Sequence, residues 1–168
     1  MEYVIFNTDM GWIAILGSVR GLVSVTLPQK SAQEAFEALG EAIKHATLSP
    51  DRFEDLIKRL QAYFGGYRVS FPDELDLSTA TPFQLKVWQI TRLIAYGEIR
   101  SYGWLAEKAG KPGAARAIGQ ALGRNPLPII IPCHRVIGSN GKLGGFSGGL
   151  EMKRRLLHLE AAITPHQR

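Results

Sequence analysis

The sequence predicts two small domains: an α/β domain with a small antiparallel sheet and helices over residues 1–76, and a mainly helical, winged helix-turn-helix-like domain over residues 77–168. Three observations support this division. Runs rich in β-branched residues open the chain, and a helical pattern restarts sharply at Thr81 after an irregular acidic stretch. The charge also changes sign: residues 1–80 carry 7 Lys and Arg against 11 Asp and Glu, net −4, whereas residues 81–168 carry 13 against 4, net +9.

The N-terminal domain is expected to begin with three strands and to continue with two helices. The strands are expected over residues 3–7, 12–16 and 22–27, with turn residues between them. Ser31, followed by Glu34 three residues later, has the pattern of a capping box and begins a helix whose apolar periodicity runs on to Ile43. A second helix follows Pro50 and ends at Gly65. These patterns are typical of core packing, and we assign no chemistry to them.

The C-terminal domain begins with a strong helix start. Thr81 is a good N-cap, Pro82 suits the first helical position, and Gln84 completes a capping box. Further along, Ser101 can cap the first of two short helices, and residues 114–122 form the second after a turn that contains glycine. Two short helices joined in this way are the helix-turn-helix pattern, although many helix pairs share it.

Small side chains dominate the second helix of this pair. Its small residues are Ala114, Ala115, Ala117, Gly119 and Ala121. Such a helix can pack closely against a neighbouring helix, or its backbone can approach DNA with Arg116 inserted between bases. The net charge of the C-terminal half favours a polyanionic partner, but it fits a solvated basic surface equally well.

Composition excludes several kinds of site. With a single cysteine the chain has no internal disulfide framework and no Cys-rich zinc site, and its four histidines fall at no ligand spacing. We therefore expect no metal and no cofactor. The sequence contains no apolar run long enough to span a bilayer and no signal-peptide pattern at its start. We expect no membrane partner and a cytoplasmic location in a bacterium or archaeon, or a nuclear one in a eukaryote.

Cys133 is the candidate nucleophile. It lies between a proline and His134, at the expected exit of a short buried strand over residues 129–131. A thiol needs a base to become a thiolate, and a base needs a group that orients it. His134 is the nearest base, and Glu160 lies on a helix that begins near Leu150. The buried face of that helix is expected to consist of Met152, Leu156 and Leu159. The Cys-His-Glu set predicts nucleophilic catalysis, and a hydrolase or acyltransferase is equally allowed.

The residues around Cys133 resemble a known family. IPCHRVIG at 131–138 is similar to the active-site signature of the O6-alkylguanine-DNA alkyltransferases (methylated-DNA–protein-cysteine methyltransferases). Further similar blocks are TPFQLKVW at 81–88, SYGWLA at 101–106, AARAIGQALGRNPLPIIIPCHRV at 114–136, GGFSGGL at 144–150 and KRRLLHLE at 153–160. Together the blocks cover nearly all of residues 80–161 in the expected order. The N-terminal half is compatible with the family's small α/β domain.

The resemblance implies a DNA repair protein. It would move the alkyl group of O6-alkylguanine to Cys133 in one irreversible, single-use event, with activity on O4-alkylthymine left open. The partner would be double-stranded DNA, bound through the minor groove with the alkylated base flipped out of the stack. A monomer is expected, and cooperative binding along DNA is left open.

The resemblance also implies a role for individual residues. Cys133 would accept the alkyl group, with His134 acting as base through a water and Glu160 fixing the imidazole tautomer. Asn125 would hold the turn before the cysteine, and Tyr102 would contact the flipped guanine and its phosphate and donate a proton. The expected base-pocket residues are Val136, Gly144, Gly145, Phe146 and Ser147. The expected DNA-binding residues are Arg116, Tyr102, Ala114, Ala115, Ala117, Gly119 and Arg135.

The sequence departs from the family in two places. Phe146 stands where many members have tyrosine, and the structural zinc of human-type members has no ligands here. Three alternatives remain to be tested: a non-catalytic alkyltransferase-like protein that binds lesions, a helix-turn-helix regulator, and a Cys-His hydrolase. The first of these lacks the cysteine that Cys133 supplies. The known two-function regulators carry an additional N-terminal module, for which this chain has no room. A hydrolase would turn over a small ester or amide without DNA.

Overall fold

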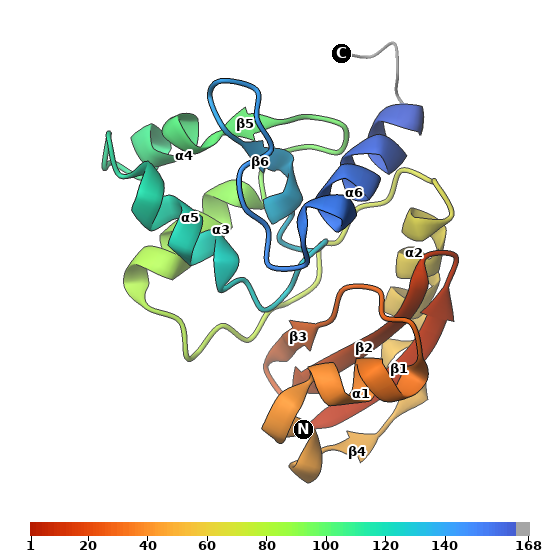
Figure 1. The fold of residues 1–168 in the computed structure, drawn as a ribbon. Helices are drawn as coiled ribbons and strands as arrows, with labels where there is room; N and C mark the ends of the chain where they lie inside the picture. The colour runs from red at the N-terminus through yellow and green to blue at the C-terminus, as the bar shows by residue number, and fades with distance from the viewer. Residues whose placement is uncertain (164–168) are drawn as a thin grey trace. The chain divides into compact units, whose positions relative to one another are not determined.

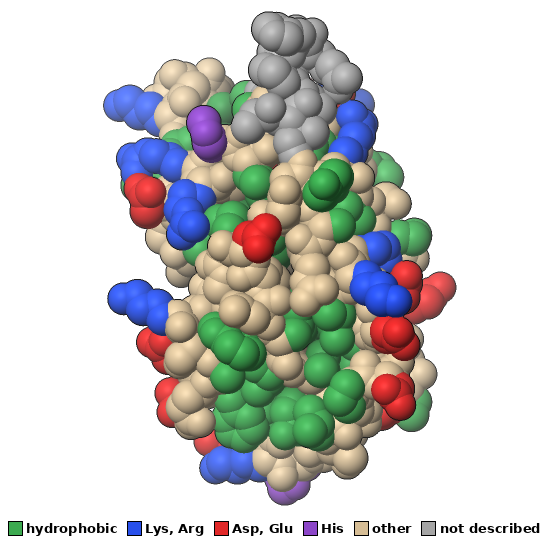
Figure 2. Space-filling view, turned by 90° about the vertical axis from the view of Figure 1, so that its right-hand side faces the viewer, with side chains coloured by type: hydrophobic (Ala, Val, Ile, Leu, Met, Phe, Trp, Pro, Cys, Tyr) green, Lys and Arg blue, Asp and Glu red, His purple; other side chains and the backbone are tan. Residues whose placement is uncertain are grey.

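The chain forms two compact units, Met1–Ser78 and Thr79–Arg168 (Figure 1). The computed structural model describes residues 1–163, with side chains up to residue 161. No helix within this described part is long and apolar enough to cross a membrane. On the face drawn in Figure 2, hydrophobic side chains gather in the lower part and most charged side chains lie toward the margins. Apolar atoms remain on the surface of every small domain, so this exposure by itself assigns no site.

A four-stranded sheet forms the centre of the N-terminal unit. Its elements are β1 (Glu2–Thr8), β2 (Gly11–Ser18), β3 (Gly21–Val25), α1 (Ala32–Ala38), the 3₁₀ helix η1 (Gly40–His45), β4 (Thr47–Leu48), the 3₁₀ helix η2 (Pro50–Phe53) and α2 (Glu54–Phe64). The strand order is β3-β2-β1-β4. The three predicted strands pair antiparallel, as expected, but β4 pairs parallel with β1 and makes the sheet mixed. A strand of two residues has no alternation that a sequence pattern could reveal.

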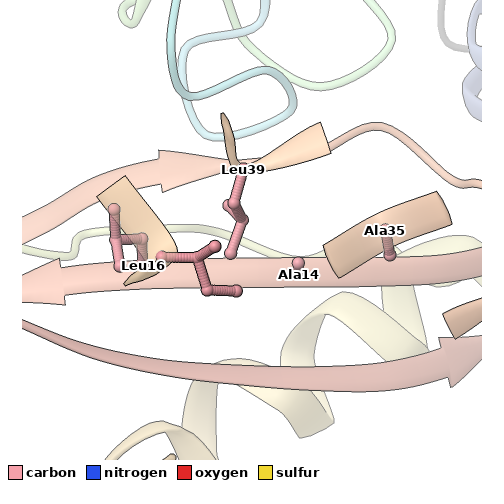
Figure 3. Close-up of a cluster of buried hydrophobic side chains, with 5 residues drawn as sticks. Ala14, Leu16, Ala35 and Leu39 are labelled. Atoms are coloured by element: carbon pink, nitrogen blue, oxygen red, sulfur yellow. The ribbon is translucent and has the colours of Figure 1, made fainter. Parts of the chain in front are cut away.

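The helix α1 packs on one face of the sheet. Its buried cluster consists of Ala14, Leu16, Ala35, Leu39 and Ile43 (Figure 3). The predicted start is confirmed, because the Ser31 side chain accepts a hydrogen bond from the Glu34 N–H at 3.1 Å. The predicted continuation to Ile43 is wrong. At Gly40 the backbone has a φ of +72°, which ends the α-helix and lets η1 bring Ile43 back to the core.

The C-terminal unit is mainly helical, as predicted. Its elements are α3 (Pro82–Thr91), β5 (Arg100–Ser101), α4 (Tyr102–Lys108), α5 (Ala115–Gly123), the 3₁₀ helix η3 (Cys133–Arg135), β6 (Val136–Ile137) and α6 (Leu150–Ile163). Both predicted caps are present. Thr81 and Gln84 form the reciprocal capping box of α3, and the Ser101 hydroxyl accepts a hydrogen bond from the Trp104 N–H at 3.0 Å. The short strands β5 and β6 pair parallel and join the start of α4 to the segment that follows Cys133.

The helices α4 and α5 form the predicted pair, joined by a turn in which Gly110 has a φ of +77°. Helix α5 packs against both α3 and α4. It buries Ile118, Ala121 and Leu122, and the Trp88 indole N–H donates to the Ala121 carbonyl at 2.9 Å. These contacts fix the rotation of α5, so its opposite face is turned outward.

The predicted strand over residues 129–131 is wrong. The segment is a turn in which Ile129 has a φ of +74°, a conformation that reverses the chain. Asn125 holds the turn, because its Nδ2 donates to the Ile131 carbonyl at 2.8 Å. The side chains of residues 129–131 are buried in this turn, as they would be in a strand. Their apolar character therefore indicated burial correctly but not the backbone conformation. The turn delivers Cys133 into the first position of η3 instead of a strand end.

Candidate active site

Cys133 lies at a cavity of about 620 Å³ in the C-terminal unit. The thiol is largely enclosed, with 6% of the residue exposed. The cavity is lined by Cys133 and Tyr102, by Ala115, Arg116, Gly119, Gln120, Leu122 and Gly123 of α5, and by Gly145, Phe146 and Ser147 of the loop before α6. The structure therefore brings together residues from four separate segments of the chain that the sequence singled out.

The thiol of Cys133 is protonated at rest. Burial raises its pKa, and this outweighs the opposing effects of the Asn125 side chain, the Lys153 charge and the backbone N–H of His134. A buried thiol resists solvent electrophiles, because the thiolate is the reactive form. Reaction therefore requires a base that takes the proton when a substrate is present.

His134 and Glu160 form the buried pair that can supply this base. The His134 Nε2 lies 2.5 Å from the Glu160 Oε2, and both residues are at most 1% exposed. Burial alone would raise the pKa of the Glu160 carboxyl, but its bonds to His134 and Arg135 bring that pKa well below the usual range. A charged carboxylate only accepts hydrogen bonds, so Nε2 carries the imidazole proton. The lone pair of the neutral ring is therefore on Nδ1.

Arg135, which we expected to bind DNA, has a different position. It is 7% exposed, and its Nε and Nη2 donate to the two oxygens of Glu160 at 2.9 and 3.1 Å. Its Nη1 donates to the Ile94 carbonyl at 2.7 Å. A guanidinium held on three sides inside the protein cannot reach a phosphate, and the DNA-binding assignment of Arg135 is corrected.

Lys153 is a site residue that the sequence reasoning missed. The side chain is fully buried, and its Nζ lies near three backbone carbonyls and one phenol. The distances are 2.7 Å to Val136 O, 2.5 Å to Leu143 O, 3.2 Å to Gly145 O and 3.4 Å to Tyr102 Oη. Burial lowers the pKa of Lys153 to about 8, while the nearby Cys133 opposes this shift. Lys153 is therefore a buried cation that joins α6 to the loop lining the cavity.

The buried face of α6 shows what signal could have found Lys153. The predicted face was wrong in two of its three positions, because Met152 and Leu159 are only half-buried. The fully buried residues are Lys153, Leu156 and Glu160, at the spacing i, i+3 and i+7. Lys153 and Glu160 lie at helical spacing on either side of the core residue Leu156. Because Glu160 was already a candidate catalytic carboxylate, this pattern could have identified Lys153 from the sequence.

Part of the loop before α6 lines the cavity as predicted. Gly145, Phe146 and Ser147 are lining residues, whereas Val136 is buried behind them with its carbonyl bound to Lys153. Gly144 instead packs against Tyr102. With a φ of +72°, an added Cβ would lie 2.6 Å from the Tyr102 hydroxyl oxygen. The Tyr102 hydroxyl also lies 3.4 Å from the Gly145 carbonyl.

The small residues of α5 divide between two faces. Ala121 is buried against Trp88, so close packing explains that position. Ala115 and Gly123 are exposed at the cavity, and Gly119 between them is half-buried. A Cβ added at Gly119 or Gly123 would meet nothing within 4 Å among the described atoms. Ala114 and Ala117 are half-buried, and Arg116 extends from the exposed side. Internal packing therefore does not account for the small residues at the cavity.

The histidines and acidic residues that the structure describes form no cluster suited to a metal ion. Within residues 1–163 there is no group of three or more His, Cys, Asp and Glu side chains that could hold a metal ion. The charged side chains near Cys133 are instead bonded to one another or to backbone carbonyls.

Family models match both units of the chain. Residues 1–77 match the ribonuclease-like domain of 6-O-methylguanine DNA methyltransferase, and residues 82–162 match its DNA binding domain. Among curated proteins, a methylated-DNA–protein-cysteine methyltransferase of Mycolicibacterium paratuberculosis is 50% identical over 98% of this chain and 95% of its own. One from Methanosarcina acetivorans is 40% identical over 96% and 99%.

Solved structures are similar over nearly the whole chain as well. The crystal structure of Mycobacterium tuberculosis OGT in complex with DNA is 41% identical, with a TM-score of 0.82 and coverage of 97% of this chain and 94% of that one. The O6-methylguanine-DNA methyltransferase of the archaeon Pyrococcus kodakaraensis is 27% identical, with a TM-score of 0.71 and coverage of 94% and 98%. Sequence and fold thus agree over both units.

Proposed function

The chain belongs to the 6-O-methylguanine DNA methyltransferase family, and from this premise we propose that it moves the alkyl group of a flipped O6-alkylguanine irreversibly to Cys133. The protein is a DNA repair alkyltransferase, and the single use of each molecule is the finer part of the proposal. The observation that carries it is the position of Cys133, buried at a cavity and followed directly by the His134–Glu160 pair.

The proposed reaction begins with loss of the thiol proton. His134 accepts it at Nδ1 through a water, since Glu160 holds the proton on Nε2. The thiolate sulfur of Cys133 then attacks the alkyl carbon. The S–C bond forms as the C–O6 bond breaks, and the electron pair stays on the base. The Tyr102 hydroxyl protonates the leaving base, and the proton that His134 took from the thiol returns to Tyr102 through solvent, so that overall the thiol proton ends on guanine.

The product is expected to be final. A thioether is stable in water unless a catalytic group activates an attack on it. Among the described residues that line the cavity, none carries a carboxylate or an imidazole. Removal of the alkyl group by water would require attack on a saturated carbon with a thiolate as leaving group, and the water beside His134 serves only to carry the thiol proton, so we expect each molecule to act once.

The open side of the cavity suits a flipped base. O6 of guanine lies inside the stacked duplex, so the nucleotide must leave the stack, at a cost of a few kcal/mol. We propose that α5 enters the minor groove with its small residues and that Arg116 fills the vacated space. Tyr102 contacts the flipped nucleotide, and the basic C-terminal half supplies sequence-independent attraction to phosphates. The protein acts as a monomer on DNA in the cytoplasm.

A single-turnover assay tests the proposal. The protein is incubated with duplex DNA that carries O6-methylguanine with a labelled methyl group, and the Cys133 peptide is examined by mass spectrometry. We expect one methyl group per molecule on that peptide and none in Cys133→Ala, which keeps its DNA binding. Binding without transfer would indicate a lesion-binding protein or a regulator, and catalytic hydrolysis of small esters would indicate a hydrolase. The same assay with O4-methylthymine defines the substrate range.

A further inference from the structure

The carboxylate of Glu160 is shared between two side chains. His134 Nε2 and Arg135 Nη2 both reach Oε2, and Arg135 Nε reaches Oε1. The Gly97 backbone N–H donates to Oε1 as well, at 3.1 Å. A carboxylate with two oxygens accepts about four hydrogen bonds, so this one is saturated. Its negative charge is thus divided between the imidazole and the guanidinium.

Arg135 is itself fixed from several sides. It donates from one edge in the bidentate geometry that best orients a carboxylate, and its third nitrogen donates to the Ile94 carbonyl. Its guanidinium carbon also lies 5.7 Å from the centre of the Tyr96 ring. The guanidinium cannot turn without breaking these contacts. It therefore keeps the Glu160 carboxylate in one position.

We propose that Arg135 acts in alkyl transfer as a positioning residue: it fixes Glu160 under His134 Nε2 and withdraws part of its charge from the imidazole, which keeps the ring neutral and able to accept a proton at Nδ1. The proposal rests on the assignment of His134 as the base. It goes beyond that assignment by explaining how a histidine that touches a buried carboxylate remains a base. A carboxylate without a second cation would stabilise the imidazolium, and an imidazolium cannot accept the thiol proton.

The charges around His134 agree with this role. Burial lowers the pKa of His134 most, Glu160 opposes this with its hydrogen bond and its charge, and the positive charges of Arg135 and Lys153 lower the pKa further. Loss of the Arg135 charge removes one lowering contribution and leaves the full charge of Glu160 facing the ring. The pKa of His134 then rises. Since a base works only above its own pKa, activity should be lost on the acid side and recovered at higher pH.

The pH profile of the single-turnover rate tests the proposal. The rate is measured from about pH 5 to about pH 9 with free O6-benzylguanine, which requires no DNA contact. In Arg135→Met we expect the acid limb to move up by about one pH unit, which is about tenfold slower transfer on that limb. Arg135→Lys keeps the charge and loses the bidentate bond, so its limb should move less. The matched control is Arg154→Met, which removes one charge from an exposed side chain of α6.

Several outcomes decide between this role and a merely structural one. A lower rate with an unmoved acid limb in Arg135→Met would overturn the proposal, and so would equal shifts in Arg135→Met and Arg154→Met. If Arg135→Met does not fold, nitrogen NMR of His134 in Arg135→Lys decides: a ring that becomes protonated at a higher pH than in the wild type supports the proposal, and an unchanged titration refutes it. Failure of the wild type to methylate Cys133 would instead refute the proposed function itself.

Discussion

The cavity at Cys133 adjoins two regions that are built in opposite ways. One is the charged cluster, formed by His134, Arg135, Lys153 and Glu160, all at most 7% exposed and bonded to one another or to backbone carbonyls. The other is the open face of α5, formed by Ala115, Gly119 and Gly123, which carry no side chain larger than a methyl group and lie beside Arg116 and Gln120 at the cavity. The charged cluster has its geometry fixed in the absence of substrate, whereas the open face of α5 leaves room for a substrate.

This difference suggests that the charged cluster serves the transfer step and that the open face of α5 serves the entry of the base from duplex DNA. Buried, bonded charges need little reorganisation during a reaction, so the charged cluster should act on every substrate, including a free base. The open face of α5 should matter only when the base arrives as part of a duplex. Changes in the charged cluster are therefore expected to slow transfer from both kinds of substrate, and changes on α5 should slow transfer from duplex DNA alone.

The largest effect is expected for Lys153→Met. Loss of the ammonium leaves the Val136 and Leu143 carbonyls without their donor and frees the loop that lines the cavity. Transfer should fall about 100-fold with duplex DNA and with free O6-benzylguanine, since small displacements of a binding site cost this much. The unfolding free energy should fall by about 3 kcal/mol. Lys142→Met, an exposed change in the same loop, is the control and should alter neither quantity.

Lys153 should also impose an alkaline limb on the wild-type rate. Its pKa is lowered to about 8 by burial, so the ammonium is present below that pH and becomes a neutral amine above it. The amine has one N–H fewer and no charge, and its hold on the loop weakens. The rate with free O6-benzylguanine should therefore decline as the pH rises through about 8. An unchanged alkaline limb in Lys153→Met would show that another group titrates there.

A smaller and more selective effect is expected for Arg116→Ala. Arg116 is exposed at the cavity, and no described side chain lies within 4 Å of it as an ion-pair partner. If it fills the space left by the flipped nucleotide, its loss should slow transfer from duplex DNA about tenfold, equivalent to about 1.4 kcal/mol. Transfer from free O6-benzylguanine should change less than about twofold. Arg124→Ala, at the far end of α5, controls for the loss of one positive charge; equal losses on both substrates would refute the role of Arg116.

Part of the fold and of the candidate site could be predicted from the sequence. The helix starts at Ser31, Thr81 and Ser101 were predictable, because a cap is a local device whose residues lie within four positions. The cysteine, the histidine and the glutamate could also be singled out as candidates, since few residue types can act as nucleophile, base and orienting carboxylate, and the structure shows His134 in contact with Glu160. The open face of α5 was visible in composition alone, although composition could not separate the face that packs from the face that stays open.

What the sequence could not give depends on contacts between distant segments. The resemblance implied that Arg135, a basic residue within the signature, binds DNA, and only its contact with Glu160, 25 residues further along the chain, shows otherwise. Lys153 was not singled out, because the expected buried face of α6 was Met152, Leu156 and Leu159, and only the packing of α6 shows that Lys153 is buried. The turn before Cys133 was misread because Ile129 adopts a positive φ, which a β-branched residue does only when its surroundings, here the Asn125 bonds, enforce it.

The smallest expected effect concerns the contact between the charged cluster and the cavity, where Tyr102 touches both Lys153 and Gly144. In Gly144→Ala the new methyl group would meet the Tyr102 ring and hydroxyl at less than normal contact distance, so Tyr102 must move. Transfer from duplex DNA and from free O6-benzylguanine should each fall about fivefold, equivalent to about 1 kcal/mol.

Gly141→Ala is the matched control, since Gly141 has the same sign of φ, at +82°, but no atom within 4 Å of an added Cβ. It should lose about 1 kcal/mol of stability from backbone strain and keep its rate. If both variants lose rate equally, loop strain and not the position of Tyr102 controls transfer, and the charged cluster does not act on the cavity through this tyrosine.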